Sequence, residues 1–371
     1  MLASLLHRWF PWLILVNSQT IKADIIAAFT CAALAIPQGI AFAAIAGLPP
    51  EYGFYSALIA PVLAVLFGSS WHMVCGPATA ISALLFSTLQ GLYLPGSAEF
   101  IQAAITLTLL AGLIQLALGL AKMGGLTNFV SHAVMVGFIT GAALLIMLSQ
   151  INNALQINLP RPENLMAFIL AIPTEFARLN MAALQIAAVT LASALLVRQI
   201  LPKAPHYLLA LIAGSAFGYG IDASNQGVML VGELPNIVPP FASPHLSFEL
   251  IRQLAPGAVV IALVGLLEAA SIARSISLKT GQEIDGNREF IGQGMSNIGG
   301  SFFSSYMSSG SFTRSGINID SGAKTPIAIL ASAAILFLVT STDLVKSRPL
   351  SMKVTAGVSR SALPKTSLEC P

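Results

Sequence analysis

The amino-acid sequence has few charged residues for its length. Of its 371 residues, 9% are Asp, Glu, Lys or Arg, whereas 56% are hydrophobic and the mean hydropathy is +0.81. A soluble globular domain carries about 25% charged residues. The shortage of charge therefore excludes a soluble enzyme, a nucleic-acid-binding protein and a disordered scaffold. It predicts an all-α, multi-pass membrane protein with the lipid bilayer as solvent for most of its surface.

Cysteine and catalytic motifs are also scarce. The three cysteines, Cys31, Cys75 and Cys370, lack metal-ligand spacing and are interpreted as small apolar residues. The sequence contains no zinc motif, phosphate-binding loop, dinucleotide fingerprint or Ser–His–Asp order. We therefore expect no enzyme activity, no metal, no cofactor and no ATP-driven pumping.

Hydrophobic runs predict eight helices that cross the membrane. A helix needs about 20 apolar residues for this, and runs near that length lie at 24–46, 52–67, 100–122, 129–148, 181–200, 204–221, 254–277 and 325–339. A weaker helix is predicted at 287–302. Residues 1–20 place Trp9, Phe10 and Trp12 beside Arg8, a pattern typical of a helix in the membrane interface.

Two further apolar pieces, 77–89 and 311–321, are too short to cross. A helix that ends inside the membrane must end in protein or at a wet cavity, with its positive dipole end toward the middle. Anions are the natural occupants of such a place. Each piece follows an extended lead-in and a glycine, and the third residue after Gly76 or Gly310 is Thr79 or Thr313. This internal likeness predicts an inverted-repeat transporter with a site at the midplane.

The distribution of Lys and Arg predicts the orientation. With a cytoplasmic N-terminus, and each short piece counted as one pass, the inner loops receive eight basic residues and the outer loops three. This asymmetry follows the positive-inside rule. It predicts a protein of the bacterial inner membrane with its N-terminus in the cytoplasm.

Two charged residues stand out in the apolar segments. Arg314 lies at the predicted buried end of a half-helix, which is costly unless it faces water or an anion. We expect it to attract an anion; pairing with Asp320, Glu268 or a backbone carbonyl is the open alternative. Glu268 follows thirteen uncharged residues, 255–267. It is a candidate proton carrier, with a carboxyl group that links two helices as the alternative.

Other polar residues have less specific interpretations. Gln38 follows Pro37, which frees a helix carbonyl, so its amide either donates to an anion or bonds a neighbouring helix. Asp24, at the head of the first predicted span, is interpreted as a solvated helix cap. His72 and His132 have no partner ligands at metal spacing, so structural or interfacial roles are expected.

Several motifs in order resemble one family. Residues 37–55 read PQGIAFAAIAGLPPEYGFY, 284–289 read IDGNRE and 310–315 read GSFTRS, with further matches at 67–72, 76–77, 292–303 and 322–325. Together they resemble the SulP sulfate permease family from about residue 15 to 340. The resemblance implies two inverted repeats of seven segments each, divided into core and gate domains, with the anion between the broken third and tenth segments. It also implies a homodimer.

The resemblance also implies site residues. Gln38 and Phe42 would line the site from the first segment, Ala78 and Thr79 would present the first half-helix, and Thr313 and Arg314 the second. Many family members have Ser where Thr313 stands, and Thr keeps the hydroxyl group. Glu268 falls where proton-coupled members carry a carboxylate.

The likeness divides the chain into expected parts. Residues 1–20 form the interfacial helix, 21–221 the first repeat and 222–340 a partial second repeat. Residues 341–371 are polar, contain five of the 18 Lys and Arg residues and do not resemble the family. The remaining spans and the cytoplasmic STAS domain of the family are absent, so we expect a truncated or frameshifted gene product.

These features together predict a secondary active anion transporter. Proton–sulfate symport by alternating access is the favoured mechanism, with an inorganic anion, a proton and the lipid bilayer as partners. The alternatives are a bicarbonate, chloride or dicarboxylate transporter, an anion channel of the same family, and a non-functional membrane fragment.

Overall fold

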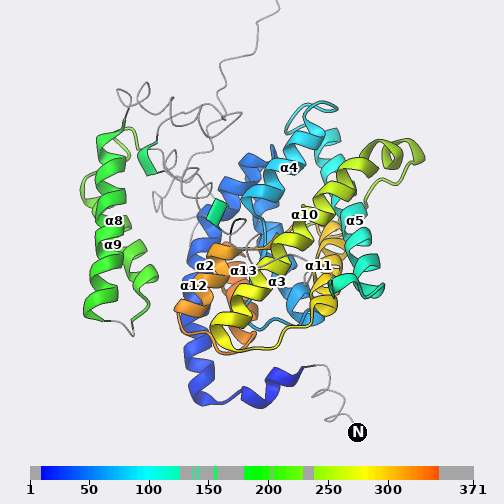
Figure 1. Cartoon of the computed structure of the whole chain (residues 1–371). Helices are drawn as coiled ribbons and strands as arrows, with labels where there is room; N and C mark the ends of the chain where they lie inside the picture. Colours follow the sequence, from blue (N-terminus) through cyan, green and yellow to red (C-terminus); the bar gives the residue numbers. More distant parts are fainter. Residues whose placement is uncertain are drawn as a thin grey trace, which may run out of the picture.

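The computed structural model is a bundle of helices with one very small sheet (Figure 1). It describes residues 10–125, 179–201, 204–228 and 238–341, together with 137, 140, 141 and 154–156. The predicted span at 129–148, His132 and the polar tail after residue 341 lie outside these described residues, apart from 137, 140 and 141.

Five described helices are long and apolar enough to cross a membrane: α2 (Ser18–Ile45), α3 (Pro50–Phe67), α5 (Ala98–Leu120), α8 (Met181–Ile200) and α10 (Phe248–Thr280). The shorter helices α9 (His206–Gly220), α11 (Gly286–Ser301) and α13 (Ile327–Ser341) also lie where the sequence predicts helices. The observed helix ends differ by a few residues from the ends predicted from the hydrophobic runs, because side-chain caps set the observed ends. α10, for example, begins before residue 254 because Ser247 Oγ accepts a hydrogen bond from the Leu250 N–H.

The first span also begins earlier than the hydrophobic run. Asn17 accepts hydrogen bonds from the N–H groups of Gln19 (2.9 Å) and Thr20 (3.0 Å), and its own N–H donates to Thr20 Oγ1 (2.8 Å). This reciprocal capping starts α2 at Ser18. A short 3-10 helix, η1 (Pro11–Leu15), precedes it and has no buried residue.

Asp24 is not a solvated cap, so that interpretation is wrong. Its side chain is fully buried, and Oδ1 accepts hydrogen bonds from the N–H groups of Lys324 (2.6 Å) and Thr325 (3.1 Å). Oδ2 accepts from the Thr325 hydroxyl at 2.5 Å. A carboxylate with three donors can remain buried. It fixes α2 to the turn before α13, about 300 residues later.

Two short helices begin inside the bundle, as the sequence predicts. α4 (Thr79–Leu89) has 11 residues and α12 (Phe312–Asp320) has 9. Each follows a two-residue strand, β1 (Cys75–Gly76) or β2 (Ser309–Gly310). The strands pair antiparallel, with Cys75 opposite Gly310 and Gly76 opposite Ser309. The extended lead-ins that precede the two half-helices are therefore joined to each other.

Helices from the two halves of the chain alternate in the bundle. α2 packs against α13 and α3, whereas α10 packs against α5, and α11 lies against both α5 and α3. Gly39 and Gly53 permit the closest approach of α2 and α3, because a β carbon on Gly53 would lie 2.0 Å from the Gly39 carbonyl oxygen. α8 and α9 pack on each other beside this bundle (Figure 1).

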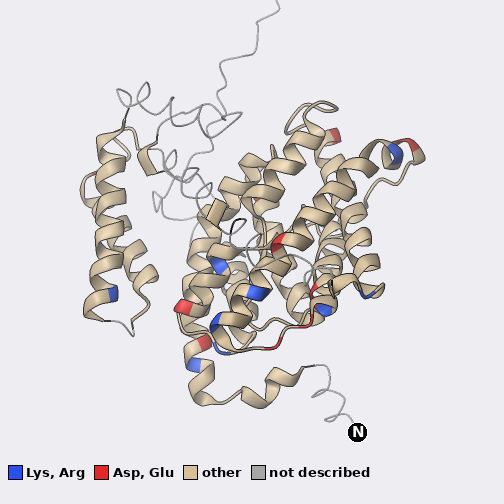
Figure 2. Ribbon diagram, viewed as in Figure 1, with Lys and Arg blue, Asp and Glu red and all other residues tan. Residues whose placement is uncertain are grey.

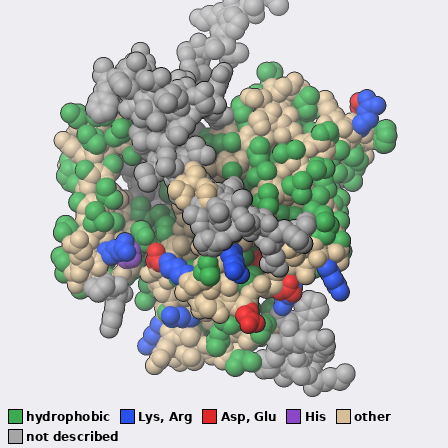
Figure 3. Space-filling view, in the orientation of Figure 1, with side chains coloured by type: hydrophobic (Ala, Val, Ile, Leu, Met, Phe, Trp, Pro, Cys, Tyr) green, Lys and Arg blue, Asp and Glu red, His purple; other side chains and the backbone are tan. Residues whose placement is uncertain are grey.

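The surface has the pattern expected for a protein in a bilayer. Hydrophobic side chains cover much of the visible outer face (Figure 3), and most of the described charged residues lie toward one end of the molecule (Figure 2). Large apolar residues such as Leu191, Leu195 and Ile212 are exposed on α8 and α9. Lipid contact accounts for this exposure, since water would penalise it.

Candidate anion site at two half-helix termini

The N-termini of α4 and α12 lie next to each other because the strands that lead into them are paired. Beyond the two-residue ladder, the Ser311 N–H donates to the Val74 carbonyl (3.0 Å), and the Val74 N–H donates to Ser315 Oγ (3.0 Å). Both helices therefore begin within a few residues of the same cross-link. Two positive helix ends in one buried place form an electrostatic environment suited to an anion.

The two helix ends are capped differently. Ser311 Oγ accepts from the Arg314 N–H (3.3 Å) and lies 3.2 Å from Thr313 Oγ1. Ala78, the corresponding residue before α4, has no side chain that can accept a hydrogen bond. The first N–H groups of α4 consequently lack a side-chain cap and remain suited to a ligand.

Arg314 is buried at the junction between the half-helices, with 2% of its surface exposed. Nη2 donates to the Pro77 carbonyl oxygen at 2.7 Å, and Nε is buried with no partner among the described residues. Asp320 instead pairs with Lys279. Of the partners considered for Arg314, Asp320 is therefore excluded, and a backbone carbonyl takes one part of the guanidinium group.

Gly76 leaves space for this guanidinium group. Its φ is +142°, and a β carbon at this position would lie 2.7 Å from Nη1 of Arg314. Both the backbone conformation and the contact require glycine. The glycine before the first half-helix thus accommodates the arginine of the second.

Glu268 lies on α10, facing the strand that leads into α12. Ser309 Oγ donates to the Gly265 carbonyl at 3.1 Å, and the Ser309 side chain is close to the Glu268 carboxyl group. The Oε2 atom of Glu268 is buried without a partner in the described part of the chain. The Arg314 charge is near enough to act on this carboxyl group through space. Glu268 therefore belongs to the same region as the half-helix termini.

The predicted residues of α2 differ in their surroundings. Phe42 is buried, whereas Gln38 is half-buried, and Gln38 Oε1 has no hydrogen-bond partner among the described residues. α2 packs against both α4 and α12. Within the described part of the chain, Gln38 Oε1 makes no helix–helix hydrogen bond, so this oxygen can accept from a donor such as a bound water.

Exposure also differs along the half-helices. Ala78 is buried, Thr79 is half-buried and Thr313 is exposed. The structure thus brings Ala78, Thr79, Thr313 and Arg314 to one junction through β1 and β2. Glu268 approaches it from α10, and α2, which carries Gln38 and Phe42, packs against both half-helices.

Sequence reasoning missed the polar residues that hold the lead-in to α12. Ser56 Oγ accepts from the Tyr306 N–H (2.9 Å), and the Tyr306 hydroxyl lies 3.1 Å from Ser82 Oγ on α4. Asn297 Oδ1 accepts from the Ser308 N–H (2.8 Å). The available signal was the unusual density of Ser, Asn and Gln in an apolar sequence, but it did not identify the partners.

Comparisons with known proteins establish the family. Residues 21–352 match the Sulfate permease family. The chain belongs to this family. It is 31% identical over 342 residues to Sulfate transporter 4.1, chloroplastic, of Arabidopsis thaliana, covering 89% of this chain and 49% of that protein. It is 33% identical over 358 residues to Sulfate transporter 1.2 of the same plant, covering 92% of this chain and 54% of that protein.

Solved structures confirm the inverted-repeat fold of the sulfate permease domain. The transmembrane domain of the cyanobacterial bicarbonate transporter BicA aligns with a TM-score of 0.71 at 21% identity, covering 92% of this chain and 86% of that one. The murine anion transporter Slc26a9 aligns with a TM-score of 0.71 at 23% identity, covering 91% of this chain and 60% of that one. The sulfate permease family consists of transporters rather than enzymes. The chain spans about half the length of the curated relatives described above.

Proposed function

We propose that this chain is a secondary active anion transporter that binds sulfate between the N-termini of α4 and α12. One observation carries the proposal: two half-helices begin side by side within a membrane domain, and the buried Arg314 lies between them. Two helix dipole ends and a guanidinium group lower the cost of bringing an anion into a low-dielectric region. The naming of relatives as sulfate transporters supports sulfate as the anion.

Each residue of the site has a proposed part. Arg314 supplies the full positive charge, and the backbone N–H groups at the start of α4 donate hydrogen bonds next to Ala78. Thr79 and Thr313 supply hydroxyl groups. Gln38 supplies an amide, and Phe42 limits the width of the site from α2.

Glu268 is proposed to carry the coupled proton. Its carboxyl group has one buried oxygen without a partner among the residues that the structure describes, and it lies within the field of Arg314. A proton on Glu268 would reduce the charge that moves inward with a divalent anion. We therefore propose that a proton enters together with sulfate.

The surrounding architecture is proposed as follows. Residues 21–221 form the first repeat and 222–340 a partial second repeat, after an interfacial N-terminal segment at 1–20. Alternating access moves the half-helix domain against the remaining helices, and the working unit is a homodimer. The N-terminus faces the cytoplasm of a bacterial cell, as the distribution of basic residues predicts.

Radiolabelled sulfate binding to the purified chain in detergent tests the site without requiring a complete transport cycle. Arg314→Ala should weaken binding by at least about tenfold, the loss of one charge-assisted interaction. Arg252→Ala is the matched control, because Arg252 is exposed near the start of α10. Equal sulfate binding by wild type and Arg314→Ala would show that the anion does not bind at this junction.

Competition and transport measurements distinguish the other anions and mechanisms. Unlabelled bicarbonate, chloride and a dicarboxylate, each added to the same binding assay, rank the anions. Uptake by vesicles that contain the chain then tests coupling, since a proton symporter accumulates sulfate when the outside is acidic. A channel of the same family would instead give electrical currents far above the turnover of a carrier.

A further inference from the structure

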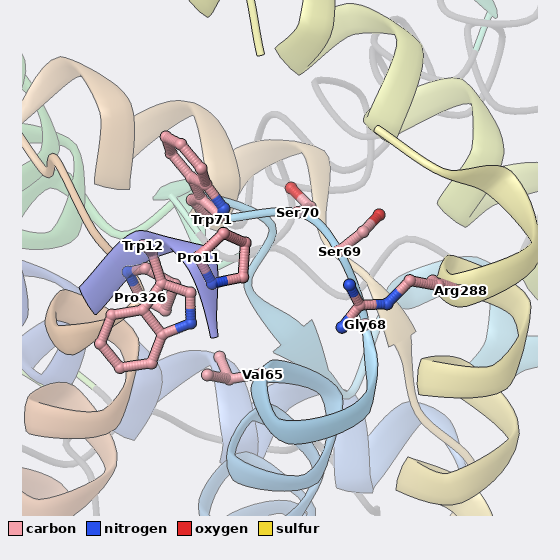
Figure 4. A pocket seen from close by; sticks show the side chains of 9 residues that line it. All are labelled: Pro11, Trp12, Val65, Gly68, Ser69, Ser70, Trp71, Arg288 and Pro326. Atoms are coloured by element: carbon pink, nitrogen blue, oxygen red, sulfur yellow. The ribbon is translucent and has the colours of Figure 1, made fainter. Parts of the chain in front are cut away.

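A small hollow beside η1 lies apart from the anion site. Figure 4 shows Trp12 on one side of it and Arg288 on the other. The charge of Arg288 already acts on the buried carboxyl group of Glu289, so it is engaged within the fold. The half-helix junction differs, because a buried polar atom there, Oε2 of Glu268, has no partner among the described residues.

Ser309 is the residue of β2 that lies next to Glu268. Its side chain is fully buried, and β2 is held in place by its pairing with β1. Directly before it, the Ser308 N–H donates to Asn297 Oδ1 at 2.8 Å. Because the backbone is fixed in this way, rotation about the single torsion χ1 decides which group the Ser309 hydroxyl contacts.

The Ser309 hydroxyl group has two acceptors within its surroundings on α10. It donates to the Gly265 carbonyl oxygen at 3.1 Å, and the carboxyl group of Glu268 is close to the same side chain. Gly265 and Glu268 are three residues apart, so they share one face of the helix. A hydroxyl group has one proton to donate and two lone pairs that accept. Ser309 can therefore donate to only one of these two groups at a time.

The proton on Glu268 determines which acceptor is the better one. A carboxylate is a stronger acceptor than a carbonyl oxygen, because hydrogen bonds to a charged group are stronger than those between neutral groups. A charged Glu268 therefore favours donation from Ser309. A protonated Glu268 can itself donate to the Ser309 oxygen while Ser309 donates to Gly265, which is the bond present in the structure.

Two further groups act on Glu268 through space in the part of the chain that the structure describes. They are the guanidinium group of Arg314 on α12 and the thiol of Cys75 on β1. Both belong to the unit that the strand pair holds together at the half-helix starts. The Ser309 contact thus comes from the same unit as these charges.

We propose that Ser309 is a positioning residue that turns its hydroxyl group between Gly265 and Glu268 as Glu268 releases or takes up a proton. The inference rests on the proposed role of Glu268 as the proton carrier. It gives β2, which leads directly into α12 and Arg314, a contact that changes with the proton on α10. Ser309 would in this way connect proton and anion without binding the anion.

Infrared spectroscopy of the purified full chain in detergent tests this contact without sulfate and without transport. A protonated carboxyl group has its own C=O stretching band, and the band that disappears in Glu268→Gln belongs to Glu268. Ser309→Ala should move this band to higher frequency, because the carboxyl group loses a hydrogen-bond partner. The pH at which the band reaches half its height should rise by about one unit, since the carboxylate loses a donor.

A pair of variants with nearly the same shape separates the hydroxyl group from packing. Ser309→Thr keeps the hydroxyl group and should give the wild-type band and midpoint, whereas Ser309→Val should behave like Ser309→Ala. Thr108→Val is the matched control, because it removes a buried hydroxyl group that donates to the Ala104 carbonyl within α5. It should leave the Glu268 band unchanged. Circular dichroism checks that each variant is folded.

The inference is overturned if Ser309→Ala and Ser309→Val both show the wild-type band and midpoint, or if no band of Glu268 appears at any pH. Sulfate binding is measured separately on the same variants and should stay near the wild-type affinity. A loss as large as that in Arg314→Ala would make Ser309 an anion ligand instead. A wild-type chain that binds no sulfate but has a Ser309-dependent band would reject the anion site and keep this contact.

Discussion

Arg314 Nη2 donates a 2.7 Å hydrogen bond to the carbonyl oxygen of Pro77, which lies 237 residues earlier in the chain. The bond connects the arginine of one half-helix to the residue just before the other. It also satisfies the carbonyl oxygen of Pro77, which is a buried residue. The buried Nε atom remains without a partner in the described part of the chain, so the guanidinium group keeps a donor for an anion.

Gly76→Ala should disturb this arrangement directly. The new methyl group would lie 2.7 Å from Arg314 Nη1, at a φ of +142° that alanine rarely adopts. We expect unfolding to become easier by about 1–3 kcal/mol, the usual cost of overpacking, and sulfate binding to weaken. Thermal unfolding in detergent and the sulfate-binding assay measure the two effects. In contrast, the methyl group added by Gly316→Ala on α12 would lie in open space. This variant should leave thermal stability and sulfate binding unchanged or slightly improved.

Asp24→Asn tests the buried link between α2 and the turn before α13. An amide has one oxygen acceptor where the carboxylate has two, so at least one donor among Lys324 N, Thr325 N and Thr325 Oγ1 loses its partner. The expected loss of stability is about 1–3 kcal/mol. Asp320→Asn, which breaks the exposed pair with Lys279, should cost about 0–1 kcal/mol. A similar loss of unfolding free energy in Asp24→Asn and Asp320→Asn would contradict the structural role of Asp24.

Asn297→Ala tests the support of the second lead-in. The substitution leaves the Ser308 N–H and Gln115 Oε1 without their partner in a fully buried place. We expect a loss of about 1–3 kcal/mol in stability, and weaker sulfate binding because Ser308 directly precedes β2. Asn225→Ala removes an exposed bond to Asp222 and is the matched control. Unchanged sulfate affinity in Asn297→Ala would confine its role to folding.

Glu268→Gln separates proton coupling from anion binding. The substitution keeps the size and polarity of the side chain but removes the ionisable group. Wild-type uptake should increase when the outside is made acidic, whereas the variant should lose this dependence and still bind sulfate. Glu249→Gln, at an exposed position on the same helix, should behave like wild type. If Glu268→Gln vesicles still accumulate sulfate in response to a pH gradient, another group carries the proton.

The half-helices were the most predictable part of the structure. Their shortness is visible in the sequence, because residues 77–89 and 311–321 cannot reach across a bilayer. The sequence also indicated that Arg314 is unusual, because a charged residue in an apolar segment must have a partner. The positions of the described helices were predicted well, but their ends were not, because caps such as Asn17 lie outside the hydrophobic runs.

Partners distant in sequence could not be predicted. Asp24 has the sequence pattern of a cap near a helix start, and only the fold brings Thr325 to it. The Ser56–Tyr306 and Asn297–Ser308 hydrogen bonds could not be predicted either, because the sequence around a polar residue does not indicate which distant group it bonds. The sequence also left open which partner Arg314 takes, which depends on the path of the backbone at Pro77.

The two-residue ladder between β1 and β2 has a mechanical consequence. Its hydrogen bonds, together with that from Ser311 to Val74, tie the starts of α4 and α12 into one piece. Pulling the two starts apart would break several buried bonds at once, without water to replace them. We therefore expect the starts of α4 and α12 to keep a constant separation if the surrounding helices rearrange, so that the proposed anion site would move as one rigid unit.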